Sequence, residues 1–349
     1  MTPAERVLSV LRGEMPDQTP FTIYENHLEQ YPYARRLQKR GLCFVKRIKS
    51  YSIETVDTKI HTETFIENGQ TLQRTVYETP KGPLEQLSQP VGFTSWSHSF
   101  LFKSEEDYPK IAAWLQDYHI TSNDAESAAL YQEYKDCPNV IIRDGLPLEP
   151  MQEIMRLMGT ENFCYEWMDN RDEILKLYGI LVERNRLIYP IVARSPFAFA
   201  NYGGNVTPAV IGPQVFRDYY LPIYAEAHQV FAKHGKLLGC HLDDDNTTIM
   251  NEIAVSQLDY VEAYDPGFSP SVKEATERFP GKILWLNWPS SWQHHTREEI
   301  ITDTLSMIRD ADPRRFILGI TENIPDNLRL RNLDAILDAV IEYGNPALH

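Results

Sequence analysis

Several residues that commonly bind divalent metal ions follow short apolar runs in the second half of the sequence. His241 and Glu262 each end such a run, and Glu322 comes shortly after another. Asp243 lies two positions beyond His241, so in a strand both side chains point to the same side. Zinc accepts His nitrogen together with Asp or Glu oxygen atoms. We therefore predict a zinc site formed by His241, Glu262 and Glu322. Asp243 is either a fourth ligand or the residue that orients the histidine. The spacing alone also allows a neutral His241 in a polar environment without metal.

Other polar and aromatic residues occupy similar positions in the chain. Tyr24 ends an apolar run near the N-terminus, and Asn287 follows the run 283–286. We predict that these two residues hold the substrate or protonate an oxygen atom that leaves it. Four further residues are predicted to bind the substrate: Asn201, Tyr202, Trp288 and Trp96. The alternative for a short polar residue at such a position is that it caps the following helix.

These residues become neighbours only if the apolar runs are strands of one parallel sheet. Short β-prone runs alternate with helical patterns along most of the chain, which is typical of successive βαβ units. The expected strands are 21–23, 91–93, 140–142, 197–200, 237–240, 260–261, 283–286 and 316–318. This number predicts a (β/α)8 TIM barrel, whose active site lies at the C-terminal ends of the strands. A doubly wound open sheet is the main alternative.

Residues 43–102 have a different pattern. Thr-rich alternating runs such as 62–66 are interrupted by turn sequences at Asn68-Gly69 and 80–83. Alternation broken by turn pairs indicates antiparallel hairpins. We therefore expect one TIM-barrel domain spanning 1–349, with 43–102 as a β-hairpin-rich insertion near its N-terminus.

Composition excludes several classes of protein. The chain has 349 residues, with 34 Lys+Arg against 49 Asp+Glu and a formal net charge of −15. This acidic balance argues against binding to nucleic acid or an anionic membrane, because both require a basic surface. No apolar run approaches the length of a membrane span, and the charged, amphipathic start does not resemble a signal peptide. The four cysteines are scattered, as in a protein of the reducing cytoplasm, so we predict free thiols and a cytoplasmic location.

Between about residues 207 and 327 the sequence resembles the uroporphyrinogen decarboxylase superfamily, and within it the cobalamin-dependent methyltransferases. The segments that carry this resemblance are 211–213, 220–224, 234–236, 241–243, 258–263, 282–287, 289–291 and 318–325. Residues 78–84 look like the hairpin turn that such proteins carry before the barrel. The resemblance implies a TIM barrel, in agreement with the strand pattern.

The sequence departs from both branches of this family at informative positions. True decarboxylases carry an Arg-rich motif near the N-terminus, whereas residues 20–26 here contain no arginine. The methyltransferases bind zinc through His-x-Cys and a later Cys. Asp243 stands at the position of the first Cys, and Thr321-Glu322 at that of the second. An oxygen-rich site favours an oxygen ligand on the substrate over a thiolate.

The resemblance therefore implies a zinc-dependent methyltransferase of the O-demethylase methyltransferase I type. It would move a methyl group from a small O-methyl donor, an aryl methyl ether, to the Co(I) corrinoid (cobalamin) of a partner protein. Members of the superfamily often pair, so a homodimer is compatible with it. Three alternatives stay open: a metal-free decarboxylase, methyl transfer from the corrinoid protein to tetrahydrofolate or a thiol, and a non-catalytic binding barrel.

Overall fold

The computed structural model describes residues 1–91 and 94–346. Within it the chain divides into two compact units. The first unit comprises residues 1–50 and 123–147 and the chain from residue 189 onward. The second comprises 51–122 and 148–188. The second unit is thus built from two separate segments, whereas the sequence pattern predicted a single insertion at 43–102.

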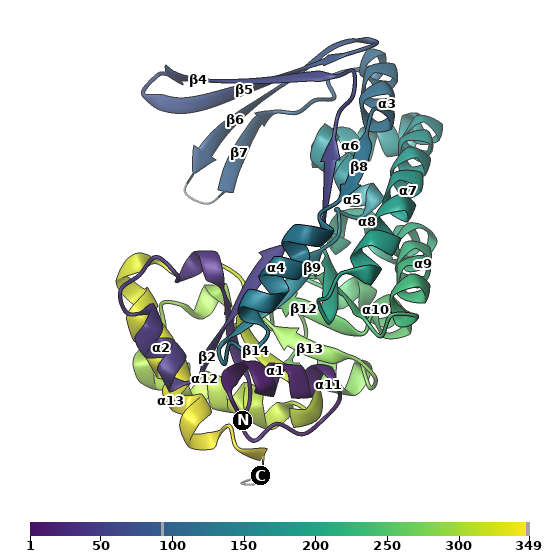
Figure 1. The fold of residues 1–349 in the computed structure, drawn as a ribbon. Helices are drawn as coiled ribbons and strands as arrows, with labels where there is room; N and C mark the ends of the chain where they lie inside the picture. Colours follow the sequence, from purple (N-terminus) through teal and green to yellow (C-terminus); the bar gives the residue numbers. More distant parts are fainter. Residues whose placement is uncertain (92–93, 347–349) are drawn as a thin grey trace. The chain divides into compact units, whose positions relative to one another are not determined.

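The first unit contains a closed barrel of eight parallel strands (Figure 1). Neighbouring strands follow the order β1-β14-β13-β12-β11-β10-β9-β2 around the barrel. The predicted (β/α)8 TIM barrel is confirmed. The strands are β1 (Phe21–Tyr24), β2 (Leu42–Ile48), β9 (Val140–Gly145), β10 (Phe199–Tyr202), β11 (Leu237–His241), β12 (Tyr260–Tyr264), β13 (Ile283–Leu286) and β14 (Phe316–Ile320).

Strand β2 differs from the prediction. It pairs in parallel with β1 and β9, so residues 43–48 belong to the barrel and not to an insertion. The predicted strand 91–93 was wrong at Val91, which ends an antiparallel strand of the second unit. Gly92 and Phe93 lie outside the described residues. β2 was not predicted as a barrel strand because only its first four residues are buried, and Lys46 and Arg47 follow them.

Helices surround the barrel strands of the first unit. α1 begins at the predicted Thr2 cap, and α12 begins at Thr296, each with a capping box to the Glu three residues later. The helices of this unit are α1 (Pro3–Leu11), α2 (Ala34–Arg40), α4 (Asp124–Tyr134), α8 (Pro208–Val215), α9 (Leu221–Ala232), α10 (Met250–Val255), α11 (Val272–Arg278), α12 (Arg297–Asp310) and α13 (Asp326–Tyr343). A short π-helical turn (Phe216–Tyr220) joins α8 to α9. Single 3-10 turns occur at Glu25–His27, Thr247–Ile249, Ser290–Trp292 and Pro313–Arg315.

Side chains alternate along each barrel strand between the interior and the surrounding helices. The interior is aromatic near its base, where Phe199, Tyr260 and Trp285 contact one another. Val7 and Val10 of α1 belong to the same buried cluster. Polar residues follow these positions toward the C-terminal ends of the strands, so the apolar base supports a polar mouth.

The second unit is rich in antiparallel strands. The predicted turn at Asn68-Gly69 joins β4 to β5, and both of its residues have positive φ. The four-stranded sheet contains β4 (Lys59–Glu67), β5 (Gln70–Thr79), β6 (Gly82–Val91) and β7 (Thr94–Ser99). A two-stranded sheet contains β3 (Tyr51–Glu54) and β8 (His119–Ser122). Its helical elements are a 3-10 turn (Glu105–Asp107), α3 (Tyr108–Gln116), α5 (Pro150–Met158), α6 (Thr160–Asp169) and most of α7 (Arg171–Arg194), which continues into the first unit.

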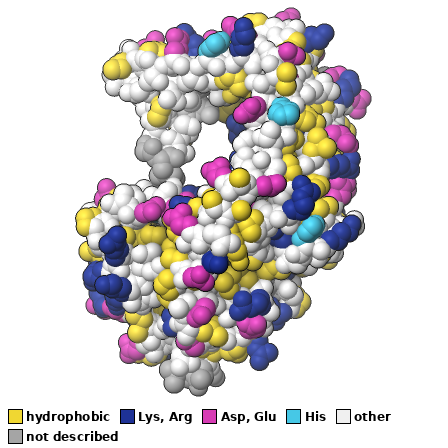
Figure 2. All heavy atoms as spheres, viewed as in Figure 1, with side chains coloured by type: hydrophobic (Ala, Val, Ile, Leu, Met, Phe, Trp, Pro, Cys, Tyr) yellow, Lys and Arg dark blue, Asp and Glu magenta, His cyan; other side chains and the backbone are white. Residues whose placement is uncertain are grey.

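The surface carries charged side chains of both signs (Figure 2). On the face shown in Figure 2, the basic side chains are scattered among acidic ones. Across the described residues, no helix has both the length and the apolar composition needed to cross a membrane. The cysteines are free thiols, as predicted, and Cys43 and Cys240 are buried.

Candidate metal centre

Three side chains that can bind a metal ion meet at the C-terminal mouth of the barrel. His241 ends β11, Asp243 follows two residues later, and Glu322 comes after β14. One ligand atom of each lies within 4.8 Å of the others. His241 is buried, whereas Asp243 and Glu322 are half-buried. The structure therefore brings together three of the four predicted ligands, and the cluster includes Asp243, whose role the sequence had left open.

A glycine allows the chain to pass close to His241. Gly204, in the loop after β10, has a φ of +75°, which side-chain-bearing residues rarely adopt. A Cβ atom at this position would lie 2.0 Å from the carbonyl oxygen of His241 and 2.5 Å from its Cβ. The loop therefore supports the backbone of His241 only because residue 204 has no side chain.

Glu262 holds the imidazole from the opposite side and is not part of the ligand cluster. Its Oε1 accepts hydrogen bonds from the Tyr24 hydroxyl at 2.8 Å and from Arg143 Nη1. Its Oε2 accepts from Asn201 Nδ2 at 2.6 Å and lies 3.1 Å from His241 Nδ1. A carboxylate has about four acceptor positions, and all are occupied here. Its position on β12 places Glu262 among four donors, so the structure groups Asp243, and not the predicted Glu262, with His241 and Glu322.

The charges of this network fix the orientation of His241. Burial alone would raise the pKa of Glu262, but the charge of Arg143 lowers it to about 2, so the carboxylate is ionised. Burial lowers the pKa of His241, and hydrogen bonds with Asp243 and Glu262 outweigh this effect and raise it to about 9. Because Glu262 only accepts, the proton of the neutral imidazole belongs on Nδ1. A metal ion would displace the proton from Nε2, which lies 3.5 Å from Asp243 Oδ2, and would leave the Nδ1 proton bonded to Glu262.

Tyr24 lies in the site, but its hydroxyl is committed to the network. It donates to Glu262, accepts from Arg143 Nη1 at 3.1 Å and lies 3.3 Å from His241 Nδ1. Burial raises its pKa well above the usual value. The guanidinium of Arg47 covers the ring at 3.9 Å. The structure therefore gives the Tyr24 hydroxyl a positioning role, and its direct action on the substrate stays a prediction.

Asn287 connects the ends of two strands. Its Oδ1 accepts from the backbone N–H of Thr321 at 3.0 Å, and its Nδ2 donates to Asp265 at 3.1 Å and to Ser290 at 3.3 Å. These bonds fix the segment that carries Glu322. Asn287 thus positions the segment that carries Glu322, and its role toward the substrate stays a prediction.

The predicted substrate-binding residues are separated by the structure. Asn201 points into the barrel and joins the site, whereas Tyr202 points outward, where its hydroxyl lies 2.5 Å from that of Tyr189 of α7. Trp288 is fully buried and donates from Nε1 to Thr304 of α12 at 3.1 Å. Trp96 lies on β7 of the second unit and is 68% exposed. Tyr202 points outward because side chains alternate along β10 and its neighbour Asn201 points inward. Trp288 lies beyond the end of β13 and packs against α12.

Sequence analysis gave no role to Arg143, although it is the counter-ion of Glu262. Its side chain is 11% exposed and that of Glu262 is fully buried. Arg143 ends the apolar run of β9 and is in the same alternating set as Ile141, which belongs to the barrel core. Counting alternate residues from Ile141 would have placed it inside the barrel.

The donor set fits a zinc ion. Zinc binds imidazole nitrogen and carboxylate oxygen, and catalytic sites have three protein ligands with a further position open. Burial raises the pKa of Glu322, and the neighbouring Asp243 and Asp265 add to this effect. A divalent cation at this position would stabilise the ionised form of Glu322.

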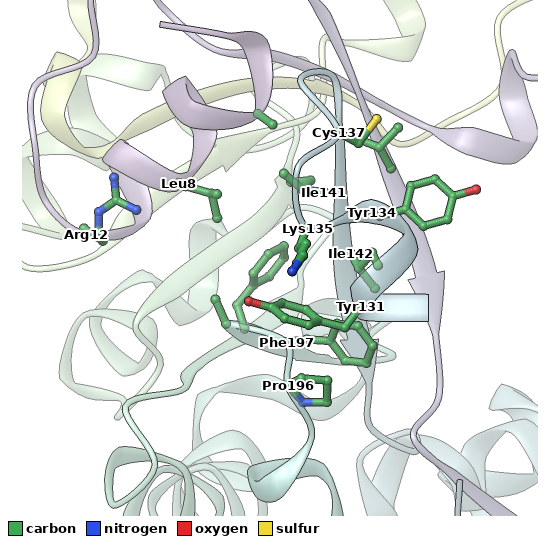
Figure 3. A pocket seen from close by; sticks show the side chains of 14 residues that line it. Leu8, Arg12, Tyr131, Tyr134, Lys135, Cys137, Ile141, Ile142, Pro196 and Phe197 are labelled. Carbon is green, nitrogen blue, oxygen red and sulfur yellow. The ribbon is translucent and has the colours of Figure 1, made fainter. Parts of the chain in front are cut away.

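A separate cavity lies at the other end of the barrel strands (Figure 3). Its volume is about 260 Å³, and its lining comes from α1, α4 and the starts of β9 and β10. Leu8, Tyr131, Ile141 and Phe197 are among the lining residues, and none of the metal-centre residues is. This cavity is therefore distinct from the candidate active site.

The chain superimposes on solved structures of other proteins. A methyltransferase from Methanosarcina mazei superimposes with a TM-score of 0.60 and 13% identity, covering 98% of this chain and 99% of the other. A B12-independent methionine synthase from Shewanella sp. W3-18-1 gives a TM-score of 0.49 and 10% identity, covering 90% and 86% of the two chains. No family model and no curated protein matches the sequence.

Proposed function

We propose that this protein is a zinc-dependent methyltransferase that moves a methyl group from an aryl methyl ether to the Co(I) corrinoid of a partner protein. The observation that carries the proposal is the group formed by His241, Asp243 and Glu322 at the mouth of the barrel. The similarly folded protein from Methanosarcina mazei is a methyltransferase, which supports methyl transfer as the reaction type.

The chemistry of the transfer explains why such a site is useful. The C–O bond of the ether breaks and its electron pair stays on oxygen, while the methyl carbon bonds to cobalt. Cobalt supplies both electrons of the new bond and passes from Co(I) to Co(III). Phenolate leaves reluctantly, and a zinc ion bound by these three residues would stabilise the negative charge on the leaving oxygen. The two carboxylate ligands suit an oxygen-containing substrate better than a thiol.

The residues around the ligands keep the site in one geometry. Glu262 orients His241, and Arg143 keeps Glu262 ionised in a buried position. Asn287 fixes the backbone beside Glu322. A preorganised site avoids rearrangement during the reaction. These side chains therefore contribute by positioning, and none of them needs to exchange a proton with the substrate.

Metal content and methyl transfer test the proposal together. Protein purified without chelators should contain about one zinc ion per chain. With a Co(I) corrinoid protein and 2-methoxyphenol, the absorption of Co(I) should be replaced by that of methyl-Co(III). His241→Ala and Glu322→Ala should abolish both zinc binding and this conversion. His295→Ala is the matched control, because His295 pairs with Asp303 at 2.8 Å outside the metal centre, and it should retain both.

The rival functions predict different results. Zinc-free protein that decarboxylates a tetrapyrrole acid would favour the metal-free decarboxylase. If the protein only removes methyl from methyl-Co(III), in the presence of tetrahydrofolate or a thiol, methyl transfer runs in the direction opposite to the proposed one. Unchanged turnover in His241→Ala and Glu322→Ala would eliminate the proposed metal centre.

A further inference from the structure

The cavity at the N-terminal ends of the barrel strands lies entirely within the first unit. Its lining comes from α1, from α4 and the segment that follows it, and from the residues at the starts of β9 and β10 (Figure 3). Three of the lining residues, Ala4, Ile141 and Phe199, also belong to the buried cluster inside the barrel. The base of the cavity is therefore part of the packed core.

Most of the lining is apolar, and several of its side chains are open to the cavity. Tyr131 is 37% exposed, and Leu8 and Val140 are half-buried. The ring of Tyr131 meets that of Phe197 edge-on, with 6.5 Å between the two centroids. An apolar ligand would remove this surface from water, and such burial stabilises a complex in proportion to the apolar area covered.

The shape and size of the cavity favour a ligand with a single aromatic ring. Four of the lining residues are aromatic: Tyr131, Tyr134, Phe197 and Phe199. Aromatic rings pack well against one another edge-to-face or offset, so a further ring among them gains contacts beyond simple burial. The volume of about 260 Å³ is at the small end of ligand pockets, which are usually about 300–1,000 Å³.

The charged side chains among the described lining residues are both basic. They are Arg12 and Lys135, although the chain as a whole has a net charge of −15. Arg12 is paired with Glu14 at 2.9 Å, so its charge is already balanced. Lys135 is exposed and forms no ion pair with any residue that the structure describes. In Figure 3 its amine points toward the middle of the lining side chains.

An unpaired cation beside an apolar, aromatic cavity is complementary to a ring that carries one negative charge. We propose that this cavity binds an aromatic monocarboxylate, with its ring against Tyr131 and Phe197 and its carboxylate toward Lys135. Hydrogen bonds between an ammonium group and a carboxylate are stronger than those between neutral groups. None of the described lining residues is acidic, so none repels the ligand. The site is separate from the metal centre and does not depend on the proposed function.

Calorimetric titration of the zinc-free protein tests the two parts of the ligand separately. Benzoate carries both the ring and the charge, benzyl alcohol has the ring without the charge, and acetate has the charge without the ring. One benzoate should bind per chain, about tenfold more tightly than benzyl alcohol, and acetate should not bind measurably. Absence of benzoate binding, or equal binding of acetate, would overturn the inference.

Substitutions in the lining assign the contacts. Lys135→Met removes the charge, so benzoate and benzyl alcohol should bind alike. Lys233→Met is the matched control, because Lys233 is an exposed lysine at the end of α9, outside the lining, and it should keep the tenfold preference. Tyr131→Ala and the cavity-filling Ala198→Leu change exposed lining positions. Both should weaken benzoate and benzyl alcohol at least about tenfold, while circular dichroism shows an unchanged fold. Unaltered binding in all these variants would refute the assignment.

Two further measurements distinguish this cavity from other positions. Glu322→Ala should bind benzoate as the wild type does, and a loss of binding would place benzoate at the metal centre. Cys137 is a free, half-buried thiol of the lining, whereas Cys164 is an exposed thiol on α6.

Saturating benzoate should slow alkylation of Cys137 by iodoacetamide and leave that of Cys164 unchanged, as measured by mass spectrometry of the peptides. Equal alkylation of Cys137 with and without benzoate would contradict the proposal. A dimer that Ala198→Leu dissociates, with no benzoate bound to the wild type, would assign the cavity to a second copy of the chain instead.

Discussion

The substitution Glu262→Gln tests whether Glu262 orients the metal ligand or binds the metal itself. Glutamine preserves the shape of the side chain but replaces one acceptor oxygen with an amide nitrogen that can only donate. Tyr24, Arg143, Asn201 and His241 would then compete for a single acceptor oxygen. At least two of these donors lose their partner. The buried guanidinium of Arg143 also loses its counter-charge.

The magnitude follows from burial. The side chain of Glu262 is fully buried and that of Arg143 is 11% exposed, so solvent does not replace the lost charge. Removing one partner of a buried ion pair destabilises a protein by about 3–5 kcal/mol. Total stabilities are usually about 5–15 kcal/mol, so this is a large fraction. Zinc affinity should fall about 10- to 100-fold, as expected when a residue that orients a ligand is altered.

Urea unfolding of the zinc-free protein, followed by circular dichroism, measures the loss in free energy of unfolding. Competition with a chromophoric chelator measures the zinc affinity. Replacing both Arg143 and Glu262 with Met should be less destabilising than the sum of the two single changes, because no unpaired charge is left. Asp243→Asn is the matched ligand variant. It should abolish tight zinc binding and destabilise the zinc-free protein less than Glu262→Gln does, since Asp243 is half-buried.

The opposite pattern would refute this reasoning. If Glu262→Gln abolished zinc binding while Asp243→Asn bound zinc normally, Glu262 would be a ligand and the cluster would have to be reassigned. A zinc-free stability within about 1 kcal/mol of the wild type would show that the network around Glu262 contributes little.

Three further predictions concern single residues of the barrel unit. Burial lowers the pKa of Lys236 to about 8, with Asp144 opposing the shift. Between pH 8 and the pKa near 10.4 that lysine has in the unfolded chain, the unfolded state binds more protons than the folded state. The free energy of unfolding, relative to that of Lys236→Met, should therefore rise by about 2 kcal/mol from pH 8 to 10. Urea unfolding across this range checks it, and a constant difference would contradict it. Tyr24→Phe should reduce turnover less than tenfold, since the hydroxyl binds Glu262. A loss of turnover beyond a thousandfold would show that Tyr24 acts directly on the substrate. Trp288→Phe should lower stability by about 1–3 kcal/mol without changing KM, and a changed KM would place Trp288 in the site.

The barrel was predictable because buried parallel strands have a local signature. Runs such as β13 (Ile283–Leu286) are short, continuously apolar and flanked by helical patterns. β2 lacks this signature in its second half, where Lys46 lies over the ring of Tyr134 and Arg47 over that of Tyr24. Lys46 is half-buried and Arg47 is exposed, so this half of the strand has no continuous apolar run.

The division of roles among the acidic residues was not predictable from spacing. Glu262 and Asp243 both stand at or just beyond strand ends, and either could bind a metal. Glu262 was excluded from the cluster by donors on β1, β9 and β10, which the fold brings to its carboxylate. Tyr202 is directed to the helices for a simpler reason, since neighbouring positions along β10 face opposite sides.

The sequence by itself determined the eight-stranded architecture in all but one strand and the end of the barrel at which polar residues gather. It also determined that His241 and Glu322 stand at this end, because periodicity and burial act over a few residues. Which carboxylate faces the metal position, and which side chains line the cavity at the other end of the barrel, was decided only by the tertiary structure. Those properties depend on distances between side chains from strands far apart in the chain, and a one-dimensional pattern does not contain them.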